Sequence, residues 1–262
     1  MKIRFIPILA FWMAISLSSG AQAMASLKDL PDTLNRIDAD GQKTGHWVEN
    51  QTEFTWRGEY LGGKKVKAWT AYFSNNNIYK VDYYENGLKN GISLMFDRKC
   101  KLSQVEYFRN GLADGKTVVY NQFNDLPQSE TEYREGKRNG LYRQYYENGK
   151  IQEETWYQND LKEGLSRWNS KAGRKMAEYQ YKAGKFEGLQ QTFYDNDTVQ
   201  TAIFYKDDLM DGEAREYYRN GKIKMSGRYL KGQKDGPWTE YDELGKVAAV
   251  IRFKEGVEQK KK

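Results

Sequence analysis

The chain has 262 residues and a formal net charge of +6, and it is 39% hydrophobic, 30% charged and 15% aromatic. So little apolar content excludes one large compact core, and so many aromatic residues exclude a disordered chain. Acidic and basic residues alternate, which leaves no basic stripe for nucleic acid. Aromatic residues interleaved with charges, with 24 Gly and only 4 Pro, predict short half-buried strands joined by tight turns.

Residues 1–23 have the pattern of a secretory signal peptide. Lys2 and Arg4 precede an apolar run from Phe5 to Leu17, and small residues end in an A-x-A pattern at Ala23, after which we expect cleavage. The alternative is an uncleaved membrane anchor, but a span needs about 20 apolar residues. Since Cys100 is the one cysteine, no internal disulfide can form. Export without disulfides favours a bacterial periplasm.

Residues 24–44 show no period, and we expect a short helical or irregular lead-in with its helix starting within Ser26–Leu30. The far end, residues 257–262, is predicted to be a basic tail.

Between these segments, residues 45–256 repeat with a period of about 24 residues. One glycine of each unit, which we expect in a longer turn between hairpins, recurs at steps of 24, with a single step of 25 between Gly115 and Gly140. A second turn residue lies four positions before it, and an aromatic residue lies three positions before that. The recurring glycines are Gly91, Gly115, Gly140, Gly164, Gly188, Gly212 and Gly236, and the aromatic residues are Tyr84, Phe108, Tyr133, Tyr157, Tyr181, Tyr205 and Tyr229.

Each unit contains a second turn, clearest at Asn148-Gly149 and Asn220-Gly221. Asn-Gly between alternating strands predicts a tight hairpin turn, because both residues tolerate positive φ. We therefore expect an all-β protein, an elongated antiparallel ribbon of about nine β-hairpins in one sheet, with stacked aromatic residues on one face. At about 4.8 Å per strand, eighteen strands would extend about 85 Å. Such a sheet must twist or coil.

The unit Tyr133 to Ile151, with Tyr-x-x-Gly-x-x-x-Gly followed by aromatic, Asn-Gly and aliphatic residues, resembles the MORN repeat in its bacterial variant. The resemblance covers roughly residues 45–256 and implies a single-sheet ribbon or solenoid of hairpins. Proteins built from this variant resemble the YwqK-family antitoxins, and similar exported proteins act as immunity proteins. The matching residues build turns and the aromatic ladder, so they carry no chemistry of their own.

The sequence offers no catalytic set. A single histidine, His46, excludes histidine-dependent triads and multi-histidine metal sites, and Cys100 occupies a turn position. We therefore expect neither an enzyme, nor a metal site, nor a cofactor.

The candidate partner-binding residues are aromatic residues that vary between units. Four lie two positions after a repeat glycine or its equivalent, where we expect a face that the ladder does not dictate, and two lie in the middle units. Exposed aromatic residues are common anchors of protein interfaces, while packing at the sheet surface is the alternative. The candidates are Trp47, Trp69, Tyr142 and Trp238, together with Trp156 and Trp168.

Export, a long repeat surface and the family resemblance together predict a periplasmic antitoxin or immunity protein. It would bind and occlude a toxin, for example an envelope-targeting lipase. The alternative is an envelope-associated scaffold that binds lipid, glycan or a membrane protein, with weak association to the membrane surface. The sequence leaves the oligomeric state open.

Overall fold

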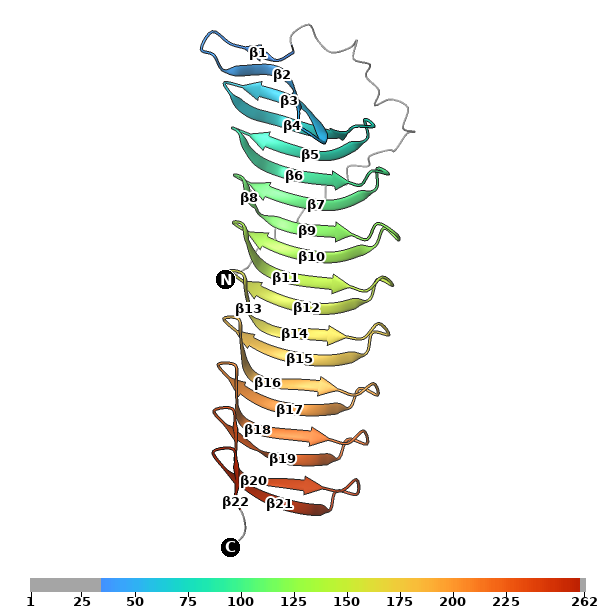
Figure 1. The fold of residues 1–262 in the computed structure, drawn as a ribbon, viewed down its shortest axis with the longest axis vertical. Helices are drawn as coiled ribbons and strands as arrows, with labels where there is room; N and C mark the ends of the chain where they lie inside the picture. Colours follow the sequence, from blue (N-terminus) through green and yellow to red (C-terminus); the bar gives the residue numbers. More distant parts are fainter. Residues whose placement is uncertain (1–33, 260–262) are drawn as a thin grey trace, which may run out of the picture.

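The computed structural model describes residues 34–259, so the predicted signal peptide, the predicted helix start at Ser26–Leu30 and the last three residues of the tail lie outside the described residues (Figure 1). The predicted all-β ribbon is confirmed: the described residues form one 22-stranded antiparallel sheet, in which strands pair in chain order. This part of the chain contains no helix long and apolar enough to cross a membrane.

Eighteen long strands supply the nine hairpins, and four short strands accompany them. The strands are β1 (Arg36–Ile37), β2 (Lys43–Asn50), β3 (Phe54–Leu61), β4 (Lys64–Phe73), β5 (Ile78–Glu85), β6 (Leu88–Phe96), β7 (Leu102–Arg109), β8 (Leu112–Ala113), β9 (Gly115–Tyr120), β10 (Pro127–Arg134), β11 (Lys137–Tyr145), β12 (Ile151–Gln158), β13 (Leu161–Lys162), β14 (Gly164–Asn169), β15 (Lys175–Lys182), β16 (Lys185–Phe193), β17 (Val199–Lys206), β18 (Leu209–Tyr217), β19 (Ile223–Leu230), β20 (Gln233–Tyr241), β21 (Val247–Lys254) and β22 (Val257–Gln259).

The two kinds of turn lie at opposite edges of the ribbon (Figure 1). The sequence pattern predicts the tight turn at the Asn-Gly edge, whereas the structure has it at the opposite edge. The tight two-residue turns follow the ladder aromatic, and both of their residues have positive φ, as at Glu135 (50°) and Gly136 (81°). At the Asn-Gly edge only the glycine has positive φ, 78° at Gly149, and its N–H donates to the carbonyl of Tyr146. The Asn-Gly pair therefore does lie in a hairpin turn, but the predicted tight form with positive φ at both residues is wrong, because the asparagine does not adopt a positive φ.

The asparagine side chains at this edge join neighbouring hairpins. Nδ2 of Asn148 donates to the carbonyl of Lys171 in the next unit, at 2.9 Å, while its Oδ1 accepts the N–H of Lys150 within the turn. Asn196 and Asn220 make the equivalent bond 23 residues onward. At the tight-turn edge, the second turn residue donates its N–H to a carbonyl of the preceding unit, as Gly184 does to Lys162. Both edges are thus hydrogen-bonded from unit to unit.

The recurring glycines lie within strands or at their first residue, beside irregularities in the pairing, and not in turns. Three residues of β6, Asn90 to Ile92, oppose the single Tyr83 of β5, and Gly91 adopts a φ of 111°. At Gly115 a Cβ would lie 2.9 Å from the Cβ of Tyr107, so both the backbone and the packing require glycine. Repeated bulges increase twist and bend the strands.

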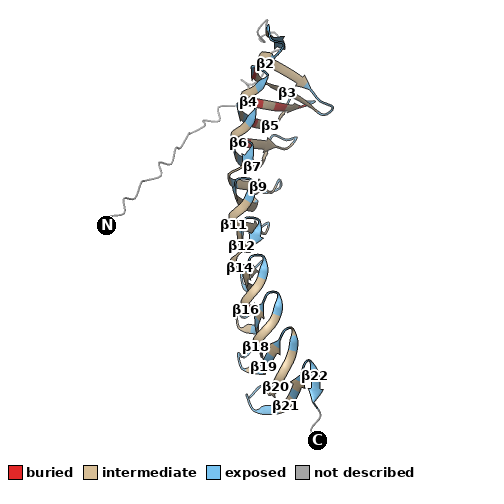
Figure 2. Ribbon diagram, turned by 90° about the vertical axis from the view of Figure 1, so that its left-hand side faces the viewer, coloured by how far each residue is buried: buried red, intermediate tan, exposed pale blue. Residues whose placement is uncertain are grey.

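The sheet has two different faces, although most of its residues are half-buried or exposed (Figure 2). The ladder face carries the recurring aromatic residues from Tyr60 and Tyr84 to Phe253, and the outer face is the opposite one. Strand alternation places every buried residue of the described chain on the ladder face, including Trp69, Asp82 and Thr155. One layer of curved sheet therefore obtains its core from one side alone.

A short strand pairs with the terminal long strand at each end of the described chain. Within the lead-in, β1 pairs with β2, and Oδ1 of Asn35 accepts the N–H of Val48. Within the tail, β22 pairs with β21. Residues 36–37 of the expected helical or irregular lead-in thus form a strand. Each short strand covers backbone groups that the terminal long strand would otherwise leave unpaired.

Candidate functional site

Two of the predicted partner-binding tryptophans belong to the core. Trp69 is 0% exposed and Trp238 is 4% exposed, so the expectation that this strand position presents a free surface is wrong for both. The position lies on the ladder face, where the Trp69 and Trp238 rings pack edge-on against Tyr60 and Tyr229, each at 5.0 Å between ring centroids.

Glycines on the preceding strands make room for these rings. A Cβ on Gly58 would lie inside the Trp69 ring, and a Cβ on Gly227 would lie inside the Trp238 ring. Both glycines occupy a position that other units fill with a larger residue such as Thr155. A glycine 11 residues before a tryptophan was therefore the sequence signal for burial.

Trp47 and Tyr142 occupy the same strand position and are half-buried. The Trp47 ring packs edge-on against Tyr60 at 5.6 Å, and its Nε1 donates to the carbonyl of Thr44. Tyr142 packs edge-on against Tyr157 at 6.1 Å. Both contribute to the ladder first, with only part of each ring open to solvent.

Trp168 lies on the ladder face, opposite Glu153 in the strand register. It is half-buried, and its Nε1 is buried without a hydrogen-bond partner in the described chain. Lys162 lies 5.7 Å from its ring centroid. This residue too is part of the packing.

Basic side chains lie over the ladder rings, a feature that the sequence pattern did not predict. Nζ of Lys65 lies 3.8 Å from the Trp69 ring centroid, a distance at which a cation and a ring attract each other. The same contact recurs along the ribbon, and its signal is a Lys or Arg two positions before the recurring glycine. Further members are Lys89 over Phe108, Arg138 over Tyr157, Lys162 over Tyr181 and Lys234 over Trp238.

Three carboxylates on the ladder face are paired with these lysines. Asp82 accepts a hydrogen bond from Ser93 Oγ at 2.6 Å and lies 3.2 Å from Lys89 Nζ. Glu153 accepts hydrogen bonds from Thr155 Oγ1 and Lys162 Nζ. Burial, together with the charge of Asp82, raises the pKa of the Tyr84 hydroxyl to about 12. These groups satisfy one another, as buried charges must.

Glu49 forms the third such group, with Lys43 Nζ at 2.7 Å, Tyr60 Oη at 2.9 Å and Lys65 Nζ at 3.2 Å. Burial acts to raise the pKa of Glu49, but the hydrogen bonds from Lys43 and Tyr60 outweigh it and lower the pKa below 4.5. The carboxylate therefore stays ionised and structural.

Neither residue weighed for catalysis lies in a cleft. The His46 side chain is 53% exposed, with Nδ1 3.8 Å from Glu59, and Cys100 is an exposed turn residue with a φ of 63°. Within residues 34–259, no group of three or more His, Cys, Asp or Glu side chains is placed to hold a metal ion.

Trp156 differs from the other candidates, because it lies on the outer face and is 51% exposed. It belongs to a column formed by the residue before each ladder aromatic. Tyr83, Tyr107 and Phe204 occupy the same column and are 44%, 43% and 41% exposed. Cross-strand partners in the same row, such as Leu141 opposite Trp156, add further apolar surface.

An alternating row of charges lies beside this column in the middle units. Arg143 Nε lies 2.8 Å from Glu154, Arg167 lies 3.5 Å from both Glu154 and Glu178, and Arg143 lies 4.0 Å from Glu130. Upstream the same row is apolar, with Val81, Leu94, Val105 and Val118 facing one another across the strands. The outer face thus changes along the ribbon from apolar to ion-paired.

Comparison with known families supports the repeat. The family described as the MORN repeat variant matches at residues 138–159, 186–207, 210–231 and 234–255. Each matched segment is one hairpin, running from just after one tight turn to the start of the next. No curated protein matches the chain. The matches indicate a repeat-based binding module.

Proposed function

We propose that this chain is a periplasmic antitoxin or immunity protein of the YwqK type, which neutralises a toxin by binding it and covering its active cleft. The observation that carries the proposal is the outer-face column of Tyr83, Tyr107, Trp156 and Phe204, each more than 40% exposed. It acts by binding and not by catalysis. A toxin directed at the envelope, such as a lipase, fits the predicted export.

The exposed column has no role in the core. All buried residues of the described chain lie on the other face, so the fold does not require large apolar side chains at Tyr107 or Trp156. Aromatic residues and arginine, which Arg143 and Arg167 supply here, are enriched at the centres of protein interfaces.

The column is also long enough for a protein partner. Ten strand steps separate Tyr83 on β5 from Phe204 on β17, which at about 4.8 Å per strand gives about 48 Å. A standard interface buries about 800 Å² on each partner, which at this length requires a strip about 17 Å wide.

The test is growth of cells that make a periplasm-directed toxin encoded beside this chain's gene, with and without the chain. The proposal predicts survival only with the chain present. Equal killing in both cultures would refute the antitoxin function.

Substitution of Trp156 locates the interface. Trp156→Ala should weaken toxin binding about 30-fold, the loss typical of a central aromatic anchor, with little change in thermal unfolding. Gln180 occupies the equivalent position one unit later, so Gln180→Ala is the matched control and should bind normally. Unchanged binding by Trp156→Ala would remove the outer face from the interface.

A second candidate is attachment to a lipid surface through the tight-turn edge. Leu88, Leu112, Leu161 and Leu209 follow the tight turns, and each is 50–52% exposed. Vesicles of phosphatidylcholine and phosphatidylglycerol should then carry the chain upward in a flotation gradient, and Leu→Ser substitutions at these four positions should abolish flotation. A chain that stays in the soluble fraction excludes this candidate.

A further inference from the structure

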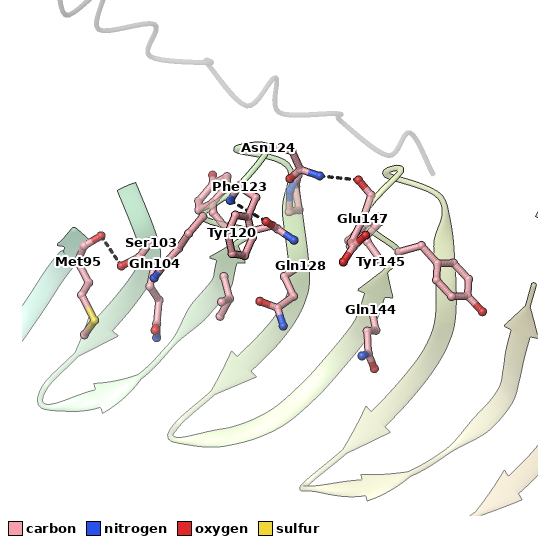
Figure 3. Close-up of a pocket in the computed structure, with 15 residues that line it drawn as sticks. Met95, Ser103, Gln104, Tyr120, Phe123, Asn124, Gln128, Gln144, Tyr145 and Glu147 are labelled. Carbon is pink, nitrogen blue, oxygen red and sulfur yellow. Dashed lines mark hydrogen bonds between the residues drawn. The ribbon is translucent and has the colours of Figure 1, made fainter. Parts of the chain in front are cut away.

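A hollow lies at the place where the period of the ribbon breaks. The step of 25 residues between Gly115 and Gly140 adds one residue to the turn at 121–126, where Asn121 N–H donates to the carbonyl of Leu126 and Asp125 N–H donates back to Asn121. Other units close this edge with shorter Asn-Gly-type turns. Beside the enlarged turn lies a hollow of about 540 Å³, a volume within the range of small-ligand sites (Figure 3).

Uncharged amides form the floor of the hollow. Gln104 on β7 and Gln144 on β11 lie in one row of the strand register, and Gln128 lies beside that row, at a bulge of β10 (Figure 3). Within the described chain, the side-chain amides of Gln104 and Gln128 have no hydrogen-bond partner, and Gln144 uses only Oε1, which accepts from Tyr142 Oη. Several donors and acceptors therefore remain free for a ligand.

The strand-register row beneath the hollow carries no charge. Between Lys80 and Glu153, the row consists of uncharged residues, namely Met95, Gln104, Val119, Ser129 and Gln144. Glu147 is the one charged residue of the lining, and its carbonyl accepts a hydrogen bond from Asn124 Nδ2. A neutral ligand fits such a lining better than an ionic one.

An aromatic ring stands at the rim. Phe123, at the tip of the enlarged turn, is 95% exposed, so it makes almost no contribution to folding. An exposed ring next to free amides combines an apolar platform with groups that both donate and accept hydrogen bonds. Hydroxyl groups also do both, and sugar rings have an apolar face of C–H groups.

We propose that this hollow binds a neutral oligosaccharide. The sugar hydroxyl groups would form hydrogen bonds with the side-chain amides of Gln104, Gln128 and Gln144, and one sugar ring would pack against Phe123. Three strand steps separate Gln104 from Gln144, about 14 Å, which exceeds one sugar ring and suits a chain of several. A peptide strand fits less well, because β6, β7, β9, β10 and β11 pair continuously here and leave no free edge for strand addition.

Isothermal titration of the full chain with cellotetraose, chitotetraose and maltotetraose tests the proposal, with an oligogalacturonate as the acidic comparison. At least one neutral oligosaccharide should bind in the millimolar range or tighter, and better than the acidic one. Phe123→Ala and Gln128→Ala should each weaken binding about fivefold or more.

Gln152 provides the matched control, since it occupies the position of Gln128 one unit later and lies outside the hollow. Gln152→Ala should bind sugar normally. The proposal is overturned if no neutral sugar binds, if the acidic sugar binds best, or if the rim and floor variants bind as well as the control.

This site is independent of the proposed toxin interface, which lies on the outer face. Phe123→Ala should therefore leave toxin neutralisation unchanged, and Trp156→Ala should leave sugar binding unchanged. If Phe123→Ala instead abolishes toxin binding while sugar titrations stay flat, the hollow belongs to the protein interface and the sugar proposal is wrong.

Discussion

The burial of Trp238 over Gly227 can be tested by a double-mutant cycle. In Gly227→Ala the new methyl group would lie inside the indole ring, so the ring or the strand must move. Gly227 has no positive φ, hence alanine brings no backbone strain and the clash acts alone. Such overpacking costs about 1–3 kcal/mol.

The second substitution removes the ring. Trp238 is 4% exposed, and truncating a buried tryptophan to alanine costs about 3–5 kcal/mol. In the double variant the methyl group meets no ring, and exchanging glycine for alanine in a compatible conformation stabilises by about 0.4–1 kcal/mol. The double variant should therefore be more stable than Trp238→Ala alone.

Urea unfolding followed by far-ultraviolet circular dichroism measures the four proteins, and hydrogen exchange localises the effect. Protection of the amides from exchange should decrease in β19 and β20 and stay unchanged in β3 and β4, because repeats contact only their neighbours. Independent sites add to within about 0.5 kcal/mol. If the double variant shows the simple sum of the two losses, the ring does not lie over Gly227.

Three further outcomes follow from the ladder face and the turn edge. The depressed pKa of Glu49 contributes stability above its unfolded value of 4.5, and this is lost as pH falls through the lower folded-state pKa, so the stability difference between the chain and Glu49→Gln should shrink between pH 7 and pH 3 in urea unfolding. Asn148→Ala removes the bond to the next hairpin and should cost about 1 kcal/mol in the same assay, and no loss would mean that water replaces the bond. Lys162→Met leaves the Glu153 carboxylate, 8% exposed, without its ion pair and should cost on the order of 3 kcal/mol, most of which Glu153→Gln in the same chain should restore.

The periodic part of the fold could be predicted from sequence because every unit solves the same packing problem. A hairpin buries too little alone, so each must place an aromatic residue at the same register as its neighbours, and Tyr157 and Tyr181 mark that register directly. Period, strand number and single sheet all follow from this.

The bulges could not be predicted, since a glycine with positive φ fits a turn and a bulge equally well. Because Gly140 was predicted to be a turn residue, the tight and the longer turns were assigned to the wrong edges of the sheet. The face on which Trp69 and Trp238 lie was therefore left undetermined. Bulge positions decide which side chains share a face, because one extra residue reverses the alternation. The aromatic stripe was visible, but its burial was not.

The two faces also differ in how freely their residues can vary. Along the ladder the column Tyr133, Tyr157, Tyr181, Tyr205 and Tyr229 does not change, because each ring packs on the groups of adjacent strands. One position earlier, on the outer face, the same units carry Glu132, Trp156, Gln180, Phe204 and Arg228. Folding does not select among these side chains, so their chemistry is free to suit a partner. The enlarged turn at 121–126 also departs from the repeat, because it is one residue longer. The positions that depart from the period are therefore where substitutions should change binding with the least effect on stability.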